Sequence, residues 1–133
     1  MHPVGAQILL IEDNPDDRSL CGFLLEAYGH DPVLATSVEE GIELARSKRP
    51  DAILLDVMLP GLGGEAVLAE LRRDRNLDEV PIVAVTVMTS PGQREHLLAA
   101  GFDGYIPKPL LPKEFARQLD QHLPSGRRSR IPD

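Results

Sequence analysis

The chain has 133 residues, a length that fits one domain, and its hydrophobic content of 42% is enough for a single buried core. No run of about 18 apolar residues predicts a transmembrane helix, and the N-terminus lacks the pattern of a signal peptide, so we expect a cytoplasmic protein without membrane insertion. The formal net charge of −7 argues against direct binding to nucleic acid, and the single cysteine excludes an intrachain disulfide and a zinc site built from several thiolates.

Five short apolar runs rich in Ile, Val and Leu predict strands. Segments with apolar residues at helical spacing follow each run and predict five helices, the last with Phe115, Leu119 and Leu123 at successive i, i+4 positions. Strands that alternate with helices need right-handed crossovers, which predicts a parallel sheet covered on both faces. The predicted strands span residues 8–11, 32–35, 52–55, 82–85 and 105–106.

Several residues predict where helices begin. Asn14 and Ser90 each precede a proline, which places a capping side chain just before the first helical position. Ser37 with Glu40 predicts a capping box at the second helix.

The C-terminal ten residues differ from the rest of the chain. They lack an apolar stripe, contain prolines and a glycine, and carry a basic cluster of Arg127, Arg128 and Arg130. We therefore expect a folded domain over residues 1–123 and a flexible basic tail or linker remnant over residues 124–133.

Polar residues follow the predicted strands. Glu12 and Asp13 come after the first strand, Asp56 ends the third, Thr86 ends the fourth, and Lys108 follows the fifth. In an open α/β sheet these positions share the carboxyl edge, where binding sites form. We therefore expect three carboxylates, a hydroxyl and an ammonium in one cleft.

Three clustered carboxylates repel one another unless a cation lies among them. Mg²⁺ prefers oxygen ligands and keeps several waters, so a few carboxylates and a backbone carbonyl suffice to hold it. The ion would polarise a phosphoryl group while one carboxylate acts as the nucleophile. The alternative is a solvated acidic loop over Glu12, Asp13, Asp16 and Asp17, whose charge is favourable near a helix N-terminus.

The order and spacing of these motifs resemble the receiver domain of two-component response regulators, over roughly residues 7–123. The resemblance implies a flavodoxin-like, doubly wound α/β fold with five parallel strands in the order 2-1-3-4-5. The segments that carry it are residues 8–14 (ILLIEDN), 56–61 (DVMLPG), Thr86 and 104–109 (GYIPKP).

The resemblance also implies roles for residues at the metal site. Asp56 matches the phosphoacceptor, and Glu12 and Asp13 match the acidic pair that binds Mg²⁺. Met58 matches the position whose backbone carbonyl completes the protein's share of the metal shell.

Other positions match the switch of the family. Thr86 corresponds to the switch hydroxyl, Tyr105 to the aromatic residue that turns inward on activation, and Lys108 to the lysine that contacts the phosphoryl group. The Lys108–Pro109 bond is expected to be cis, an isomer that X-Pro bonds reach at low cost.

The partners implied are a histidine kinase or phosphotransfer protein that supplies the phosphoryl group, and a downstream protein target or output domain. A homodimer through the face of the fourth and fifth helices is also compatible with the resemblance. The domain would assist its own phosphorylation and dephosphorylation. It would act as a signalling switch more than as a metabolic enzyme.

The chain departs from the family pattern at several positions. Gly63 stands where Asp or Ser is frequent, which is expected to leave that loop less constrained. Val87 is bulkier than the usual Ala and is expected to narrow access to Asp56. Met58 and Met88 occupy positions that tune dephosphorylation, and neither side chain can orient a water, so we expect slow self-catalysed loss of phosphate.

Two other functions fit part of the pattern. A small phosphohydrolase shares the Mg²⁺ and the aspartyl nucleophile, but it usually needs a second acid where Met58 stands and a cap over the substrate. A phosphorylation-independent interaction module would be favoured if key site residues were missing. The histidines show no metal-ligand spacing and are interpreted as surface or packing residues.

Overall fold

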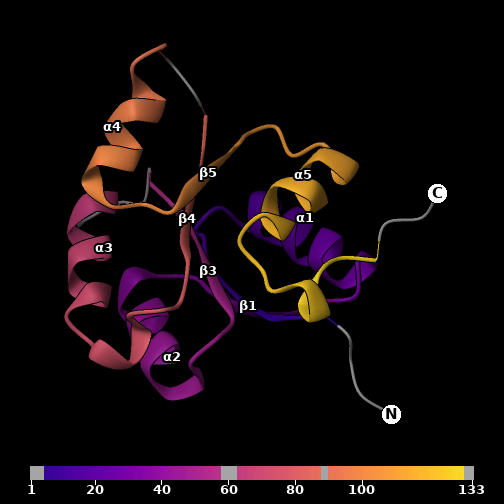
Figure 1. Cartoon of the computed structure of the whole chain (residues 1–133), viewed down its shortest axis with the longest axis horizontal. Helices are drawn as coiled ribbons and strands as arrows, with labels where there is room; N and C mark the ends of the chain where they lie inside the picture. Colours follow the sequence, from indigo (N-terminus) through magenta and orange to yellow (C-terminus); the bar gives the residue numbers. More distant parts are fainter. Residues whose placement is uncertain (1–4, 58–62, 88–89, 131–133) are drawn as a thin grey trace.

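A computed structural model describes residues 5–57, 63–87 and 90–130 of the chain. Five parallel strands form one sheet in the order β2-β1-β3-β4-β5, which confirms the expected flavodoxin-like topology (Figure 1). Four strands extend one residue beyond their predicted range at one end, and β5 extends one residue beyond it at both ends. The strands are β1 (Gln7–Ile11), β2 (Asp31–Ala35), β3 (Ala52–Asp56), β4 (Ile82–Thr86) and β5 (Gly104–Pro107).

A helix follows each strand, as the apolar spacing predicts, and two short 3₁₀ turns complete the described elements. Within these residues no helix has the length and apolar character needed to cross a membrane. The elements are α1 (Pro15–Ala27), α2 (Val38–Lys48), α3 (Gly64–Arg72), η1 (Arg75–Leu77), α4 (Gln93–Ala100), α5 (Pro112–Asp120) and η2 (Ser125–Arg127).

The helices divide between the two faces of the sheet (Figure 1). Leu25 of α1 and Leu119 of α5 belong to one buried apolar cluster. Ala45 of α2, Val67 of α3 and Leu97 of α4 belong to a second cluster on the opposite face. β1, β3 and β4 lie between the two layers, which explains why they are almost continuously apolar.

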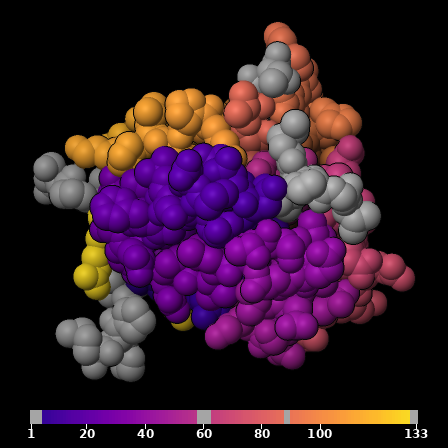
Figure 2. Space-filling view, turned by 180° about the vertical axis from the view of Figure 1, so that it is seen from behind, coloured from indigo at the N-terminus to yellow at the C-terminus, as the bar shows by residue number. Residues whose placement is uncertain are grey.

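The reverse side of the molecule shows how the N-terminal segments contribute to its surface (Figure 2). The indigo segment that contains α1 lies between the orange α5 region and the purple segment that contains α2. Phe23 of α1 is exposed, whereas Leu24 and Leu25 beside it are buried. One stripe of α1 therefore faces the sheet and another faces solvent.

The strand register brings the carboxyl ends of the central strands to one edge. Ile11 pairs with Leu55, and Asp56 with Val85. Thr86 pairs with Pro107, the residue before Lys108. The predicted polar residues therefore leave the sheet at the same edge.

The helix starts follow the sequence signals unequally. The Asn14 side chain accepts hydrogen bonds from two backbone N–H groups of α1, and Ser37 Oγ accepts one from Glu40, so both caps are confirmed. The Glu40 carboxylate reaches the backbone N–H of Thr36 instead of that of Ser37, which leaves the capping box half formed. The prediction that Ser90 caps a helix is wrong. Helix α4 begins at Gln93, two residues after the predicted start at Pro91, and Gly92 before it provides no side-chain cap.

Residues 124–130 return to the domain. The Arg130 N–H donates to the Tyr28 carbonyl at 2.9 Å, and Arg127 Nη1 donates to the Gly5 carbonyl at 3.0 Å. Ser129 donates from both its N–H and its Oγ to the Asp120 carboxylate, each at 2.8 Å. The division of the chain at residue 123 stays a prediction, but the described part of the expected tail has specific contacts.

Candidate functional site

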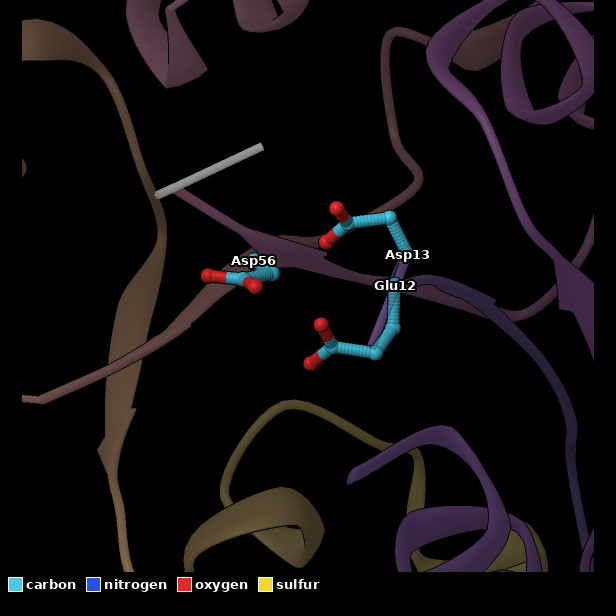
Figure 3. A group of neighbouring side chains, drawn as sticks. All are labelled: Glu12, Asp13 and Asp56. Atoms are coloured by element: carbon cyan, nitrogen blue, oxygen red, sulfur yellow. The ribbon is translucent and has the colours of Figure 1, made fainter. Parts of the chain in front are cut away.

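Three carboxylates converge at the carboxyl edge of the sheet (Figure 3). Glu12 and Asp13 follow β1, Asp56 ends β3, and one oxygen from each lies within 4.8 Å of the others. Glu12 and Asp56 are almost completely buried, whereas Asp13 is exposed. The cluster therefore has a closed side toward the sheet and an open side toward solvent.

The local sequence explains why the acidic pair faces the cleft. The buried residues of β1 fix the strand up to Ile11, and the Asn14 cap starts α1 three residues later. Arg18 of α1 donates from Nη1 to the carbonyls of Glu12 and Asp13, at 3.0 and 3.3 Å. These contacts hold the connecting turn.

Lys108 supplies the positive charge of the site. Its Nζ lies 2.9 Å from Glu12, 3.0 Å from Asp17 and 3.6 Å from Asp56. The Lys108 N–H donates to the Thr86 carbonyl at 2.9 Å, which joins the end of β5 to the end of β4. The Lys108–Pro109 bond is cis, as the resemblance implies.

Burial and charge shift the ionisation of this cluster. Burial raises the pKa of Glu12 to about 7, and the neighbouring Asp56 raises it while Lys108 opposes the change. Burial would lower the pKa of Lys108, but its hydrogen bonds to Glu12 and Asp17, together with the charge of Asp56, raise it above the ordinary value. The ammonium therefore stays charged and offsets part of the carboxylate repulsion.

Thr86 ends β4, the strand next to the one that carries Asp56, and Tyr105 lies on the neighbouring strand β5. Thr86 is buried, and its Oγ1 donates a long hydrogen bond of 3.4 Å to the Val87 carbonyl. Tyr105 is partly buried against the cluster of α2, α3 and α4, and the Arg94 guanidinium lies 5.7 Å from the centre of its ring. Such a contact is a cation–π interaction.

Two of the departures from the family pattern, Gly63 and Val87, lie among the described residues. A Cβ on Gly63 would meet open space, whereas one on Gly64 would lie 2.9 Å from Val57, so the close approach requires glycine at the second position. The Val87 side chain is 53% exposed. Met58 and Met88 lie outside the described residues, and their expected roles stay predictions.

The structure adds a residue that the sequence interpretation did not assign to the site. The sequence places Asp17 only in an acidic loop, yet its carboxylate lies 3.0 Å from Lys108 Nζ. The two residues are 91 positions apart, so only the helical phase of α1 could have indicated that Asp17 faces the cleft.

All donors in the acidic cluster are oxygens, which suits a hard divalent cation such as Mg²⁺. A buried carboxylate (Asp56), a nearby ammonium and a buried hydroxyl are also present, and a carboxylate in such a setting can act as a nucleophile. An open, doubly wound parallel sheet with this group at its carboxyl edge defines a flavodoxin-like domain whose edge can bind a divalent cation and a phosphoryl group.

Comparison with known proteins agrees with that class. Residues 8–120 match the response regulator receiver domain family. The chain therefore belongs to the receiver domains of two-component systems, which are signalling domains rather than metabolic enzymes.

Individual relatives span most of the chain. It is 33% identical to the polar-differentiation response regulator DivK of Brucella ovis, over 87% of this chain and 94% of that protein. It is 36% identical to the receiver domain of the sensor histidine kinase PA1611 of Pseudomonas aeruginosa, with a TM-score of 0.79 over 88% of this chain and 96% of that one. That structure has a magnesium ion coordinated in its active-site cleft.

The chemotaxis response regulator CheY4 of Vibrio cholerae shares the fold, with a TM-score of 0.83 and 26% identity over 90% of this chain and 99% of that one. The TM-scores of both solved structures show that they share the fold described above.

Proposed function

We propose that Asp56 accepts a phosphoryl group from the phosphohistidine of a histidine kinase or phosphotransfer protein, or from a small acyl phosphate. An Asp56 oxygen forms the new bond to phosphorus, and the bond from phosphorus to the donor nitrogen or oxygen breaks. The observation that carries the proposal is the convergence of Glu12, Asp13 and Asp56, with Lys108 beside them.

The proposed metal is Mg²⁺, held by Glu12, Asp13, Asp56 and the backbone carbonyl of Met58. Its oxygen donor set supports this assignment, since Mg²⁺ favours carboxylates and carbonyls. When bound, the ion neutralises charge on the phosphoryl oxygens and on the carboxylates. The exposed Asp13 leaves a route for its entry from solvent.

We assign Lys108 and Thr86 to the phosphoryl oxygens. Lys108 provides a point charge, and Thr86 provides a hydroxyl donor from the adjacent strand. A phosphoryl group adds roughly 1.5 to 2 negative charges at neutral pH, so both side chains are drawn toward Asp56. The movement of Thr86 opens space into which Tyr105 turns.

The output surface in this proposal is the face formed by α4, β5 and α5. A hollow on it is lined by Arg94, Tyr105, Gln118 and His122, among others. The turn of Tyr105 would change this hollow and the Arg94 contact, and with them the affinity for a downstream target or a second copy of the domain. We place this activity in the cytoplasm and assign to the domain both the gain and the slow loss of its own phosphate.

Intact mass after incubation with Mg²⁺ and an acyl phosphate tests the proposal. The wild-type chain should gain the mass of one phosphoryl group, and Asp56→Asn should gain none. Asp51→Asn, at the amino end of the same strand, is the matched control and should react as the wild type does. Modification that is equal in Asp56→Asn, or that persists when the metal is chelated, would contradict the proposal.

A further inference from the structure

We infer that Asp17 is a positioning residue that holds the Lys108 ammonium on the α1 side of the cleft and competes with the phosphoryl group for it. The inference rests on the function proposed above. It assigns to an α1 side chain a role in setting how readily the site accepts the phosphoryl group.

The geometry of Lys108 carries this inference. An ammonium has three hydrogen-bond donors. Two of them are used, on Glu12 at 2.9 Å and on Asp17 at 3.0 Å, while the Asp56 oxygen lies further away at 3.6 Å. A phosphoryl group on Asp56 would draw the ammonium toward itself, and the two short contacts oppose that movement.

The two short contacts differ in how easily they can be released. The Glu12 side chain is 2% exposed and follows a buried strand, so it cannot turn toward water when it loses its contact with Lys108. The Asp17 side chain is 43% exposed on the first turn of α1 and can turn toward water. The contact with Asp17 is therefore the one that gives way.

The surroundings of Lys108 leave room for that movement. A cavity of about 80 Å³ lies beside the Lys108 side chain, lined mainly by apolar groups including Leu20, Cys21, Val85 and Leu110. The Lys108 side chain is therefore loosely packed on the side of this cavity and can change conformation without displacing a tightly packed neighbour there.

Asp17→Asn tests the inference, with Asp16→Asn as the matched control. Both variants remove one negative charge from the first turn of α1, but Asp16 is exposed, and of these two residues only Asp17 contacts Lys108. With saturating Mg²⁺, the affinity for beryllofluoride, a stable phosphoryl mimic, is measured by amide NMR. Asp17→Asn should bind it roughly two- to fivefold more tightly than wild type, the range measured for partly exposed ion pairs, and Asp16→Asn should change the affinity clearly less.

A second measurement examines the holding contact without metal or phosphoryl mimic. The rate of reductive methylation at Lys108 should rise several-fold in Asp17→Asn and stay at the wild-type rate in Asp16→Asn. The exposed Lys48 and Lys113 serve as internal references. Unchanged methylation at Lys108 in Asp17→Asn would overturn the inference, because the ammonium would then not be held by Asp17.

The outcomes separate the inference from the function on which it rests. If wild type binds beryllofluoride but Asp17→Asn binds it equally or more weakly, the inference is wrong and the proposed function stands. If wild type with Mg²⁺ does not bind beryllofluoride, the proposed function fails, and the competition fails with it.

Discussion

A single residue, Lys108, supplies the positive charge beside two nearly buried carboxylates, Glu12 and Asp56. With Lys108→Met, Glu12 and Asp56 lose their nearest cation in the described site. Without divalent metal at pH 8, above the pKa of about 7 for Glu12, we expect the free energy of unfolding to fall by about 1 to 3 kcal/mol.

The size of that loss should depend on pH. At pH 6 Glu12 can take up a proton, so the loss should be smaller than at pH 8. Urea unfolding at both pH values measures it, and the exposed Lys113→Met is the control, with an expected change below about 0.5 kcal/mol. A loss of equal size at both pH values would count against the electrostatic explanation.

Asp13 is the exposed member of the acidic cluster, so its replacement should separate metal binding from stability. We expect Asp13→Asn to weaken Mg²⁺ binding at least about tenfold, because one of a small number of anionic ligands is lost. Thermal stability should stay the same or rise slightly, since repulsion from Glu12 and Asp56 is relieved.

Mg²⁺ titrations followed by amide NMR, together with thermal melts, check this expectation. Asp16→Asn changes the charge by the same amount outside the cluster and should leave Mg²⁺ affinity nearly unchanged. Equal affinities in wild type and Asp13→Asn would remove Asp13 from the metal site.

At the scale of the element, the start of α1 depends on one side chain. Asn14 Oδ1 accepts hydrogen bonds from the N–H groups of Asp16 and Asp17 at 2.9 and 3.0 Å. Asn14→Ala should therefore cost about 1 kcal/mol of stability. Ser90→Ala should cost little, because α4 begins after Gly92 and lacks a side-chain cap. Urea unfolding of the two variants compares them directly, and equal losses would mean that Ser90 stabilises its helix in another way.

The same contrast shows what the sequence could predict. The five strands and the Asn14 cap follow from local patterns, since apolar runs and capping residues act over a few positions. The order of the strands follows only from the resemblance to receiver domains. Ser90 with Pro91 has the same local pattern as Asn14 with Pro15, but the chain forms a turn there before α4 starts. The capping preference of Ser90 and Pro91 therefore does not determine where α4 begins.

The candidate site was predictable for a similar reason. Glu12, Asp13, Asp56, Thr86 and Lys108 each lie at a strand end, and parallel strands share one carboxyl edge. The contact of Lys108 with Asp17 was not predictable in this way, because it depends on how α1 packs against the loop after β5. The helical phase of α1 indicates at most that Asp17 faces the cleft, and the sequence alone does not identify Lys108 as its partner.

At the scale of the whole molecule, the C-terminal segment joins parts of the chain that are far apart in sequence. Its hydrogen bonds reach Gly5, Tyr28, His30 and Asp120. Removal of residues 124–133 should lower the free energy of unfolding by about 1 to 3 kcal/mol, since several partly buried hydrogen bonds are lost. A chain that ends after Arg130 is the control, because it keeps the hydrogen bonds named above and should lose clearly less stability. If the chain without residues 124–133 is as stable as the full chain, these hydrogen bonds contribute nothing to the free energy of unfolding.

His30 gives this arrangement a pH dependence. Its Nδ1 accepts from the Ala6 N–H at 2.9 Å, and its Nε2 lies 2.8 Å from Ser129 Oγ, so the neutral ring with its proton on Nε2 fits both partners. Burial lowers the pKa of His30 below 6.5, although the charges of Asp120 and Asp51 oppose the change. The contribution of the neutral ring is therefore complete above the ordinary His pKa and is lost as the pH falls below it.

His30→Gln isolates this effect, because glutamine offers an acceptor and a donor without titrating. The stability of wild type relative to His30→Gln should be constant above about pH 7.5 and should decrease below about pH 6.5, by at most about 1.4 kcal/mol per pH unit. His122, whose pKa burial also lowers, is present in both chains and cancels in the comparison. Urea unfolding from pH 5 to pH 8 measures the difference, and a constant difference over that range would contradict the assignment.

The central claim is that phosphorylation at Asp56 is transmitted to Thr86 and Tyr105. Amide NMR with Mg²⁺ and beryllofluoride, on wild type and on Asp56→Asn, tests it most directly. We predict Mg²⁺-dependent shifts at Thr86 and Tyr105 in wild type and none in Asp56→Asn. Unchanged signals at both residues in wild type, or the same shifts in Asp56→Asn, would contradict the account.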